Sequence, residues 1–293
     1  MYRRLVSSSP VAVLRYAAFT SDAVGGNPAG VVLTADELAD DAMLGIAADV
    51  GYSETAFLSS FVGGEGVLRY FSPLAEVAFC GHATIATAVA IAERHGAGPM
   101  RFQTPAGTVD VVTRREGDEI IAALVSPPAS SAPMTEAELD DLRSAFGWAV
   151  DDLDPRFPPH VGSAGNRHPL IGLRDRERLA RFDYDYDALA DVMARREWTT
   201  VHVFHRRAEG VFDVRNAFPP GGVREDPATG AAAAAFGAYL RDRGSLPQGS
   251  EVVLHQGVDM GVPCRLVISA VPDSTAISVA GAAHTIGPDR TRR

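Results

Sequence analysis

The sequence contains no lysine, and all 27 of its basic residues are arginine. Pyridoxal-phosphate enzymes and Schiff-base aldolases need a lysine amine for their covalent chemistry, and a P-loop needs a lysine to reach its phosphates. These classes are therefore excluded. The formal net charge is −10 and no basic run is present. Because nucleic-acid-binding domains present a positive face, we also expect no nucleic-acid partner.

Cysteine is scarce as well, since the chain has only Cys80 and Cys264 and no CxxC pair. Two cysteines make no disulfide framework in a chain of this length, and the scattered histidines show no ligand spacing, so we expect no metal site. No apolar run approaches the roughly 20 residues of a membrane-spanning helix, so we expect no membrane partner. Arg3 and Arg4 precede a mild apolar run, as in a twin-arginine signal, but Arg15 interrupts it. We therefore predict a cytoplasmic protein.

One pattern of elements occurs twice along the chain. In each half, strand-like segments are followed by one helix that is apolar or small on nearly every side, and further strands follow. These two helices are expected over residues 81–96 and 229–244. A helix of this kind has to be enclosed on all sides. The duplication predicts an α+β fold of two pseudo-symmetric lobes, each a curled, mostly antiparallel sheet or barrel wrapped around its central apolar helix.

The remaining elements follow from periodicity and from turn residues. Surface helices are expected over residues 36–50, 134–147 and 184–196. Strands are expected over residues 11–20, 30–33, 54–62, 66–72, 100–104, 107–114, 119–125, 199–205, 210–217, 251–255, 263–270 and 275–280. The Pro- and Ser-rich stretch 126–133 divides an N-terminal lobe, residues 1–128, from a C-terminal lobe, residues 129–281. The tail 282–293 is expected to return to the first lobe.

Glycine stands at the start of both apolar helices, as Gly81 and Gly230. The first N–H groups of a helix are free and carry partial positive charge, so two such ends facing one cleft can hold a carboxylate or an enolate without lysine or metal. Proton abstraction beside a carboxylate also requires a positioned base. Glu54 enters an apolar strand in SETAF, and His82 and Asp226 lie at the two helix starts. These residues indicate proton transfer at carbon.

Five segments carry a family resemblance: AFTSDAVGGNPAGVVL (18–33), GYSETAFL (51–58), RYFSPLAEVAFCGHATIATA (69–88), EDPATGAAAAAFGAYL (225–240) and HQGVDMG (255–261). In this order, and spread over almost the whole chain, they resemble the PhzF family of phenazine-biosynthesis isomerases, which share the diaminopimelate epimerase fold. The resemblance implies the two-lobed fold, a homodimer, no cofactor and a small carboxylate substrate. In the phenazine enzyme this machinery shuttles a proton during isomerisation of dihydro-hydroxyanthranilate.

The resemblance also implies roles for single residues. The catalytic glutamate of the family falls on Glu54, its aspartate on Asp226 and its histidine on His82. The substrate-binding residues are then Asn27, Ser53, Cys80, Gly81, Ala83, Gly230 and Ala231. The family often has serine where this chain has Ala231, and arginine where it has Val262. Both departures affect the expected substrate more than the expected fold.

Two alternatives to this function remain open from the sequence. In cysteine racemases of the same fold, thiols flank the substrate carbon from two helix starts, and Cys80 occupies the first of these positions. Thr229 occupies the second and is not a thiol base, so this alternative is an amino-acid epimerase that depends on Cys80 alone. The other alternative is a catalytically idle homologue that binds a metabolite or a protein, for which the missing hydroxyl at Ala231 is an argument.

Overall fold

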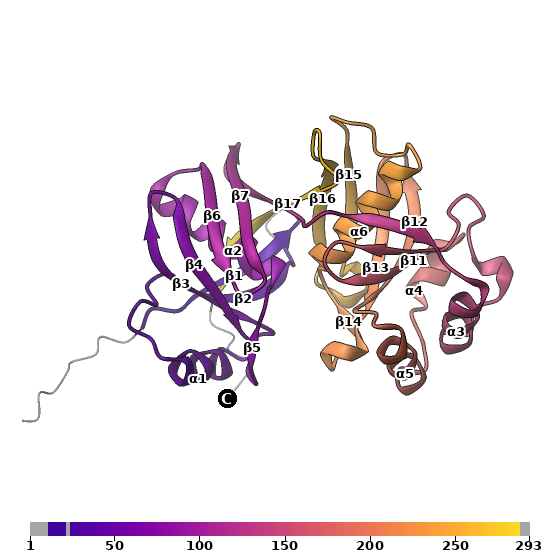
Figure 1. Cartoon of the computed structure of the whole chain (residues 1–293), viewed down its shortest axis with the longest axis horizontal. Coiled ribbons are helices and arrows are strands. Elements are labelled where there is room, and N and C mark those ends of the chain that lie inside the picture. The colour runs from indigo at the N-terminus through magenta and orange to yellow at the C-terminus, as the bar shows by residue number, and fades with distance from the viewer. Residues whose placement is uncertain (1–10, 22–23, 288–293) are drawn as a thin grey trace, which may run out of the picture.

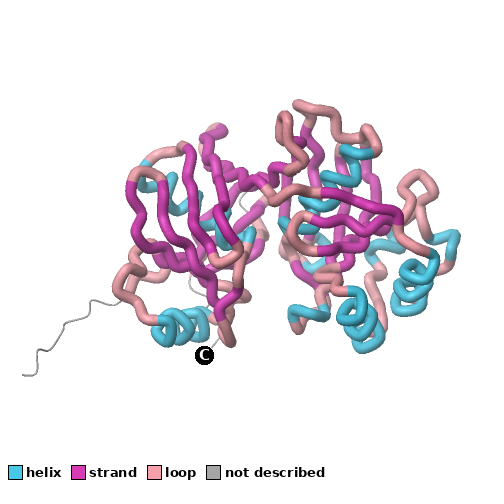
Figure 2. Tube along the Cα trace, viewed as in Figure 1, coloured by secondary structure: helices cyan, strands magenta, loops and turns pink. Residues whose placement is uncertain are grey.

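The computed structural model describes residues 11–21 and 24–287, and the predictions made for Arg3, Arg4 and the end of the tail lie outside these residues. The chain forms two halves that lie side by side and are joined by strands (Figure 1). Strands dominate both halves, one helix runs inside each, and the remaining helices lie on the outside (Figure 2). None of the helices in the described part of the chain combines the length and the apolarity that crossing a bilayer requires.

The first half is a closed ring of strands. Its strands are β1 (Leu14–Thr20), β2 (Asn27–Val32), β3 (Thr55–Val62), β4 (Glu65–Phe71), β6 (Pro99–Thr104), β7 (Gly107–Glu116), β8 (Glu119–Val125) and β17 (Ile277–Thr285). They pair in the order β1–β2–β3–β4–β6–β7–β8–β17, and β17 pairs with β1 to close the ring. Only β2–β3 and β4–β6 are parallel. The ring encloses α2 (Gly81–His95), in which every residue from His82 to Ala92 is buried.

The second half repeats this order. Its strands are β9 (Ser130–Pro133), β10 (His160–Ser163), β11 (Arg167–Gly172), β12 (Val201–Ala208), β13 (Val211–Ala217), β15 (Glu251–Gln256) and β16 (Cys264–Ala270). Here β11–β12 and β13–β15 are the parallel pairs, at the positions that β2–β3 and β4–β6 hold in the first half. The sheet packs around α6 (Gly230–Asp242), buried from Ala232 to Leu240. The predicted fold class is therefore confirmed.

Two equivalent ion pairs, one in each half, show the duplication at the level of single residues. The two-residue strands β5 (Glu76–Val77) and β14 (Glu225–Asp226) come just before the central helices and pair with β4 and β13. Arg69 on β4 forms a bidentate ion pair with Glu76. Arg215 on β13 does the same with Glu225, at the equivalent register. Each arginine thus fixes the segment that leads into a central helix.

The outer helices cover the flanks of the two sheets. They are α1 (Asp40–Val50), α3 (Glu136–Phe146), α4 (Arg176–Ala180) and α5 (Tyr186–Arg196), with short 3-10 turns η1 (Val150–Asp152), η2 (Pro219–Gly221) and η3 (Val258–Met260). α3 begins at a capping box in which the Thr135 hydroxyl accepts a hydrogen bond from the N–H of Glu138. α1 begins at Asp40, later than predicted, because residues 35–38 form a separate turn in which the N–H of Leu38 donates to the carbonyl of Ala35.

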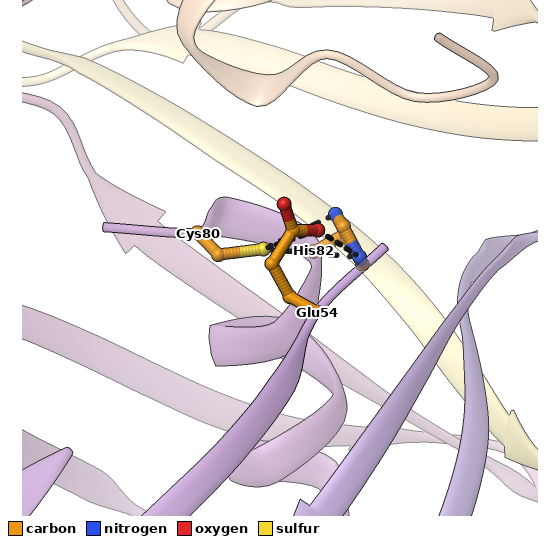
Figure 3. A group of neighbouring side chains, drawn as sticks. All are labelled: Glu54, Cys80 and His82. Atoms are coloured by element: carbon orange, nitrogen blue, oxygen red, sulfur yellow. Dashed lines mark hydrogen bonds and ion pairs between the residues drawn. The ribbon is translucent and has the colours of Figure 1, made fainter. Parts of the chain in front are cut away.

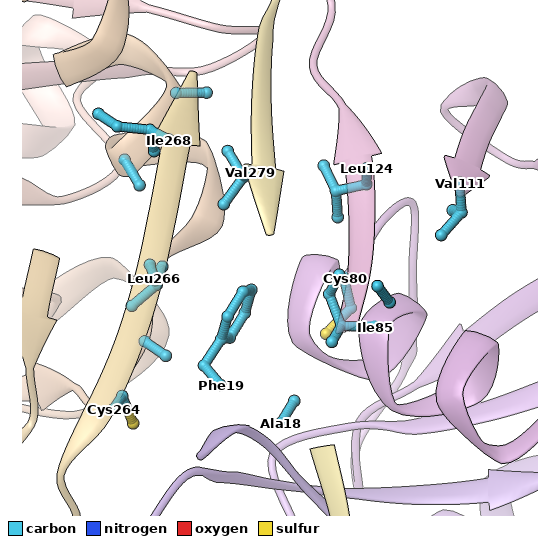
Figure 4. Packing of buried hydrophobic residues seen from close by; sticks show 14 of the residues in the cluster. Ala18, Phe19, Cys80, Ile85, Val111, Leu124, Cys264, Leu266, Ile268 and Val279 are labelled. Atoms are coloured by element: carbon cyan, nitrogen blue, oxygen red, sulfur yellow. The ribbon is translucent and has the colours of Figure 1, made fainter. Parts of the chain in front are cut away.

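β17 joins the two halves and is longer than the predicted strand, which ended at residue 280. Its first residues pair with β16 and β8, and residues 282–285 pair with β1. One hydrophobic core accordingly runs through both halves. Phe19 lies between Leu266 on β16 and Ile85 on α2 (Figure 4). Because β17 pairs with strands of both halves, the lobe boundary at residues 128/129 stays a prediction.

Candidate active site

The starts of the two central helices face one cavity of about 800 Å³. Gly81 of α2 and Gly230 and Ala231 of α6 are among its lining residues. The N-cap residues Cys80 and Thr229 make no side-chain capping hydrogen bond to their helices. The N–H groups of the first turns are therefore left for a ligand, and an anion is the ligand that a helix start favours.

Glu54 lies just before β3, where its backbone carbonyl accepts a hydrogen bond from the N–H of Gly30. Its side chain is 23% exposed. The Oε2 atom stands 3.4 Å from Nε2 of His82 and 3.5 Å from Sγ of Cys80. In Figure 3 the thiol and the imidazole both point toward this carboxylate. A carboxylate in this position can exchange protons with the imidazole. Glu54 and His82 lie at the same helix start as Gly81 but are not themselves among the residues that line the cavity.

His82 occupies the first turn of α2 and is almost fully buried. Besides its contact with Glu54, Nε2 lies 3.5 Å from Oγ of Ser53, and Nδ1 lies 3.3 Å from Sγ of Cys80. Burial, and next the charge of Glu54, raise the pKa of the Cys80 thiol well above its ordinary value. The thiol is therefore protonated at neutral pH, which opposes its use as a base.

Asp226 stands on β14 at the start of α6. Its Oδ1 accepts a hydrogen bond from Nδ2 of Asn27 (3.2 Å), and its Oδ2 accepts one from Oγ1 of Thr229 (2.6 Å). Burial is the main cause that raises the pKa of Asp226, and the negative charge of Glu54 raises it further. The Thr229 hydroxyl and a positive charge on His82 act in the opposite direction. The charge of Glu54 thus helps to set the protonation of Asp226.

Gln256 and Thr229 support Asp226 and were not among the predicted site residues. Nε2 of Gln256 donates to the backbone carbonyl of Asp226 (2.6 Å), and its Oε1 accepts from the N–H of Thr229 (3.1 Å). Gln256 is buried at the end of β15. Gln256 stands in the HQGVDMG segment that carries part of the family resemblance, so the sequence contained a signal for it.

The predicted site residues therefore fall into three places. Ser53, Glu54, Cys80 and His82 make one cluster at the start of α2. Asn27 comes from the first half but joins Asp226 at the start of α6. The glycines and Ala231 line the cavity, and Ala83 is fully buried within the first turn of α2.

Comparison with known proteins identifies the family to which this chain belongs. A model of the PhzC-PhzF family, described as phenazine biosynthesis-like protein, matches residues 16–287. The chain belongs to the PhzF family. It is 32% identical over 256 residues to the "uncharacterized isomerase YfhB" of Bacillus subtilis, covering 85% of this chain and 87% of the relative. It is 29% identical over 281 residues to the trans-2,3-dihydro-3-hydroxyanthranilate isomerase of Pseudomonas fluorescens, covering 92% and 95%.

Solved structures of the family agree with the fold. A PhzF-family phenazine biosynthesis protein of Bacillus anthracis superposes with a TM-score of 0.82 at 27% identity, over 94% of this chain and 96% of that one. As a PhzF protein with relatives named as isomerases, this chain is an isomerase of the PhzF type. The prediction of an isomerase made from the sequence is thereby confirmed.

Proposed function

We propose that this PhzF isomerase moves a proton on a small carboxylate substrate, that Glu54 carries the proton, and that Asp226 and His82 assist it without a cofactor. One observation carries the proposal: the Glu54 carboxylate stands 3.4 Å from His82 at the uncapped start of α2. Asp226, with a raised pKa, stands at the uncapped start of α6. Both helix starts border the same cavity.

In the proposed reaction the substrate lies in this cavity with its anionic portion at the N–H groups of residues 81–83 and 230–232. Glu54 removes a proton from carbon, and the negative charge that develops is stabilised by the same N–H groups. Asp226 keeps its own proton at a higher pH than an ordinary aspartate and is suited to deliver it at a second position. His82 relays the proton between the two carboxyl groups or orients the substrate.

The cavity lining favours a substrate with an apolar or ring portion beside its carboxylate. Phe79, Val109, Leu124 and Pro127 supply apolar surface, and Ser126 and Asn166 supply polar groups. No arginine or histidine is among the lining residues that the structure describes. The carboxylate is therefore expected to bind through backbone N–H groups. Trans-2,3-dihydro-3-hydroxyanthranilate, named for a relative, has this character and is one candidate substrate.

We further infer that the protein acts in the cytoplasm as a homodimer, on the strength of its PhzF membership. Sedimentation equilibrium tests the dimer, because a mass near 31.0 kDa at micromolar concentration would show a monomer instead.

Proton exchange in D2O, followed by NMR, tests the proposed function. The wild type is incubated with a panel of small carboxylates that includes amino acids and trans-2,3-dihydro-3-hydroxyanthranilate. We expect deuterium to enter one carbon position of a substrate with the wild type and with Glu65→Gln, an exposed carboxylate control, but not with Glu54→Gln. Exchange that persists in Glu54→Gln and is lost in Cys80→Ser would support the thiol-dependent epimerase. Saturable binding without exchange across the panel would support the idle homologue.

A further inference from the structure

Glu54, Cys80 and His82 bring together one oxygen, one sulfur and one nitrogen donor. Their donor atoms all lie within 4.8 Å of one another. The three residues come from two separate segments, the lead-in to β3 and the start of α2, and both segments are fixed by the sheet and the helix. All three residues are of types that ligate metal ions in proteins, although proton transfer as proposed above requires no metal.

The three distances between Oε2, Sγ and Nε2 approach those of one coordination geometry. In tetrahedral zinc sites with Zn–S near 2.3 Å and Zn–N and Zn–O near 2.1 Å, sulfur lies about 3.6 Å from nitrogen and oxygen, which lie about 3.4 Å apart. Here Sγ of Cys80 lies 3.5 Å from Oε2 of Glu54 and 3.7 Å from Nε2 of His82. Oε2 and Nε2 lie 3.4 Å apart. Sγ of Cys80 lies nearer Nδ1 of His82 (3.3 Å) than Nε2, so the imidazole has to turn for Nε2 to face an ion placed among the three donors.

The donor types select the metal. Mg²⁺ and Ca²⁺ prefer sites made of oxygen alone, whereas thiolate together with imidazole favours Zn²⁺. Three protein ligands leave a fourth position open for water or an anion, as in many accessible zinc sites. Glu54 keeps 23% of its side chain exposed, which gives an ion a path to the cluster.

We propose that Glu54, Cys80 and His82 bind Zn²⁺ and that the bound ion inhibits the isomerase. When the Zn–S bond forms, the Cys80 thiol loses its proton to solvent, and Glu54 and His82 each donate an electron pair to the ion. The carboxylate that serves as the base is then coordinated and no longer available for a substrate proton. Only the inhibition rests on the proposed function, since the binding does not depend on which residue is the base.

Cobalt(II) is the probe for the binding, because a thiolate ligand gives Co²⁺ a sulfur-to-metal charge-transfer absorption in the near ultraviolet. We expect the wild type to bind one Co²⁺ per chain with this band, and Zn²⁺ to displace it. Cys80→Ser should lose the band, while Cys264→Ser, which removes the other free thiol, should keep it. His82→Gln should weaken binding at least tenfold. A wild type without the thiolate band, or a band that survives in Cys80→Ser, would overturn the proposal.

The inhibition is measured separately, by adding Zn²⁺ to the deuterium-exchange assay and reversing it with a chelator. Binding and inhibition are both supported if two results hold. The Zn²⁺ concentration that halves the exchange rate should agree with the affinity measured by displacement of Co²⁺. Zn²⁺ should also leave the exchange rate of Cys80→Ser at that variant's own zinc-free value. Binding without inhibition would reject the inhibition and would also count against Glu54 as the base. Absence of binding with full exchange activity would reject the metal site alone.

Discussion

His168 and His202 should make the stability of this protein fall steeply in mild acid. Both side chains are fully buried in the second half. Nδ1 of His168 lies 2.9 Å from Oγ1 of Thr200, and Nδ1 of His202 lies 3.3 Å from Oδ1 of Asn216. Burial lowers the pKa of His168 to about 4 and that of His202 to about 3. Both imidazoles are therefore neutral in the folded protein at pH 5.

The sign of the effect follows from proton uptake. An unfolded histidine has a pKa near 6.5, so below that pH the unfolded chain binds two protons that the folded chain does not. Their contribution to stability is complete above pH 6.5 and is lost as the pH falls toward 4. The two histidines together lower the free energy of unfolding by about 3 kcal/mol per pH unit in this window.

Urea unfolding at several pH values between 7 and 4.5 measures the slope. His202→Leu removes one of the two titrating groups and places an apolar side chain among aromatic neighbours. In the wild type the ring centroids of His202 and Phe236 lie 5.0 Å apart. We expect this variant to lose about half of the histidine contribution to the slope. The exposed histidine variant His95→Gln should keep the wild-type slope. An unchanged slope in His202→Leu would refute the reasoning.

Three further variants test the two ion pairs and the support of Asp226. Arg215→Met leaves Glu225, whose side chain is 7% exposed, without its partner and should lower the free energy of unfolding by about 3–5 kcal/mol. Arg69→Met breaks the equivalent but more exposed pair of the first half and should lower it by about 1 kcal/mol. Equal losses for the two variants in chemical denaturation would contradict this. Thr229→Val removes the 2.6 Å hydrogen bond to Asp226, so the pKa of Asp226 should rise and its limb of the kcat/KM profile should move upward by about one pH unit. A limb that stays in place would show that Asp226 does not control it.

The central helices could be read from the sequence because their signal is local. Segments that are small and apolar on every side have to be enclosed wherever they lie, and the predicted ranges 81–96 and 229–244 end close to the observed ones. β9, β10 and β11 were not predicted. Their sequences are short and contain Ser, Gly, His and Pro, and they become strands through pairing with one another and with β12. Tertiary pairing of this kind leaves little trace in local periodicity.

The contacts of the candidate site also depend on tertiary structure more than on local sequence. The grouping of Glu54 with His82 follows from the fold, which brings the lead-in to β3 next to the start of α2. The contact between Asn27 and Asp226 joins residues that are 199 positions apart, so no spacing rule predicts it. Gln256 was missed for the same reason, since its role depends on β15 ending beside the start of α6. Family resemblance, rather than residue chemistry alone, was the source of most of the predicted site residues, and their roles stay predictions.

The central claim is that Glu54 carries the proton. It is tested most directly by comparing deuterium exchange into a bound substrate by the wild type and by Glu54→Gln, with substrate binding measured on both proteins by calorimetry. The account predicts that Glu54→Gln binds substrate and folds like the wild type but exchanges at least about 100-fold more slowly, the lower end for loss of a general base. Exchange at the wild-type rate in Glu54→Gln would contradict it.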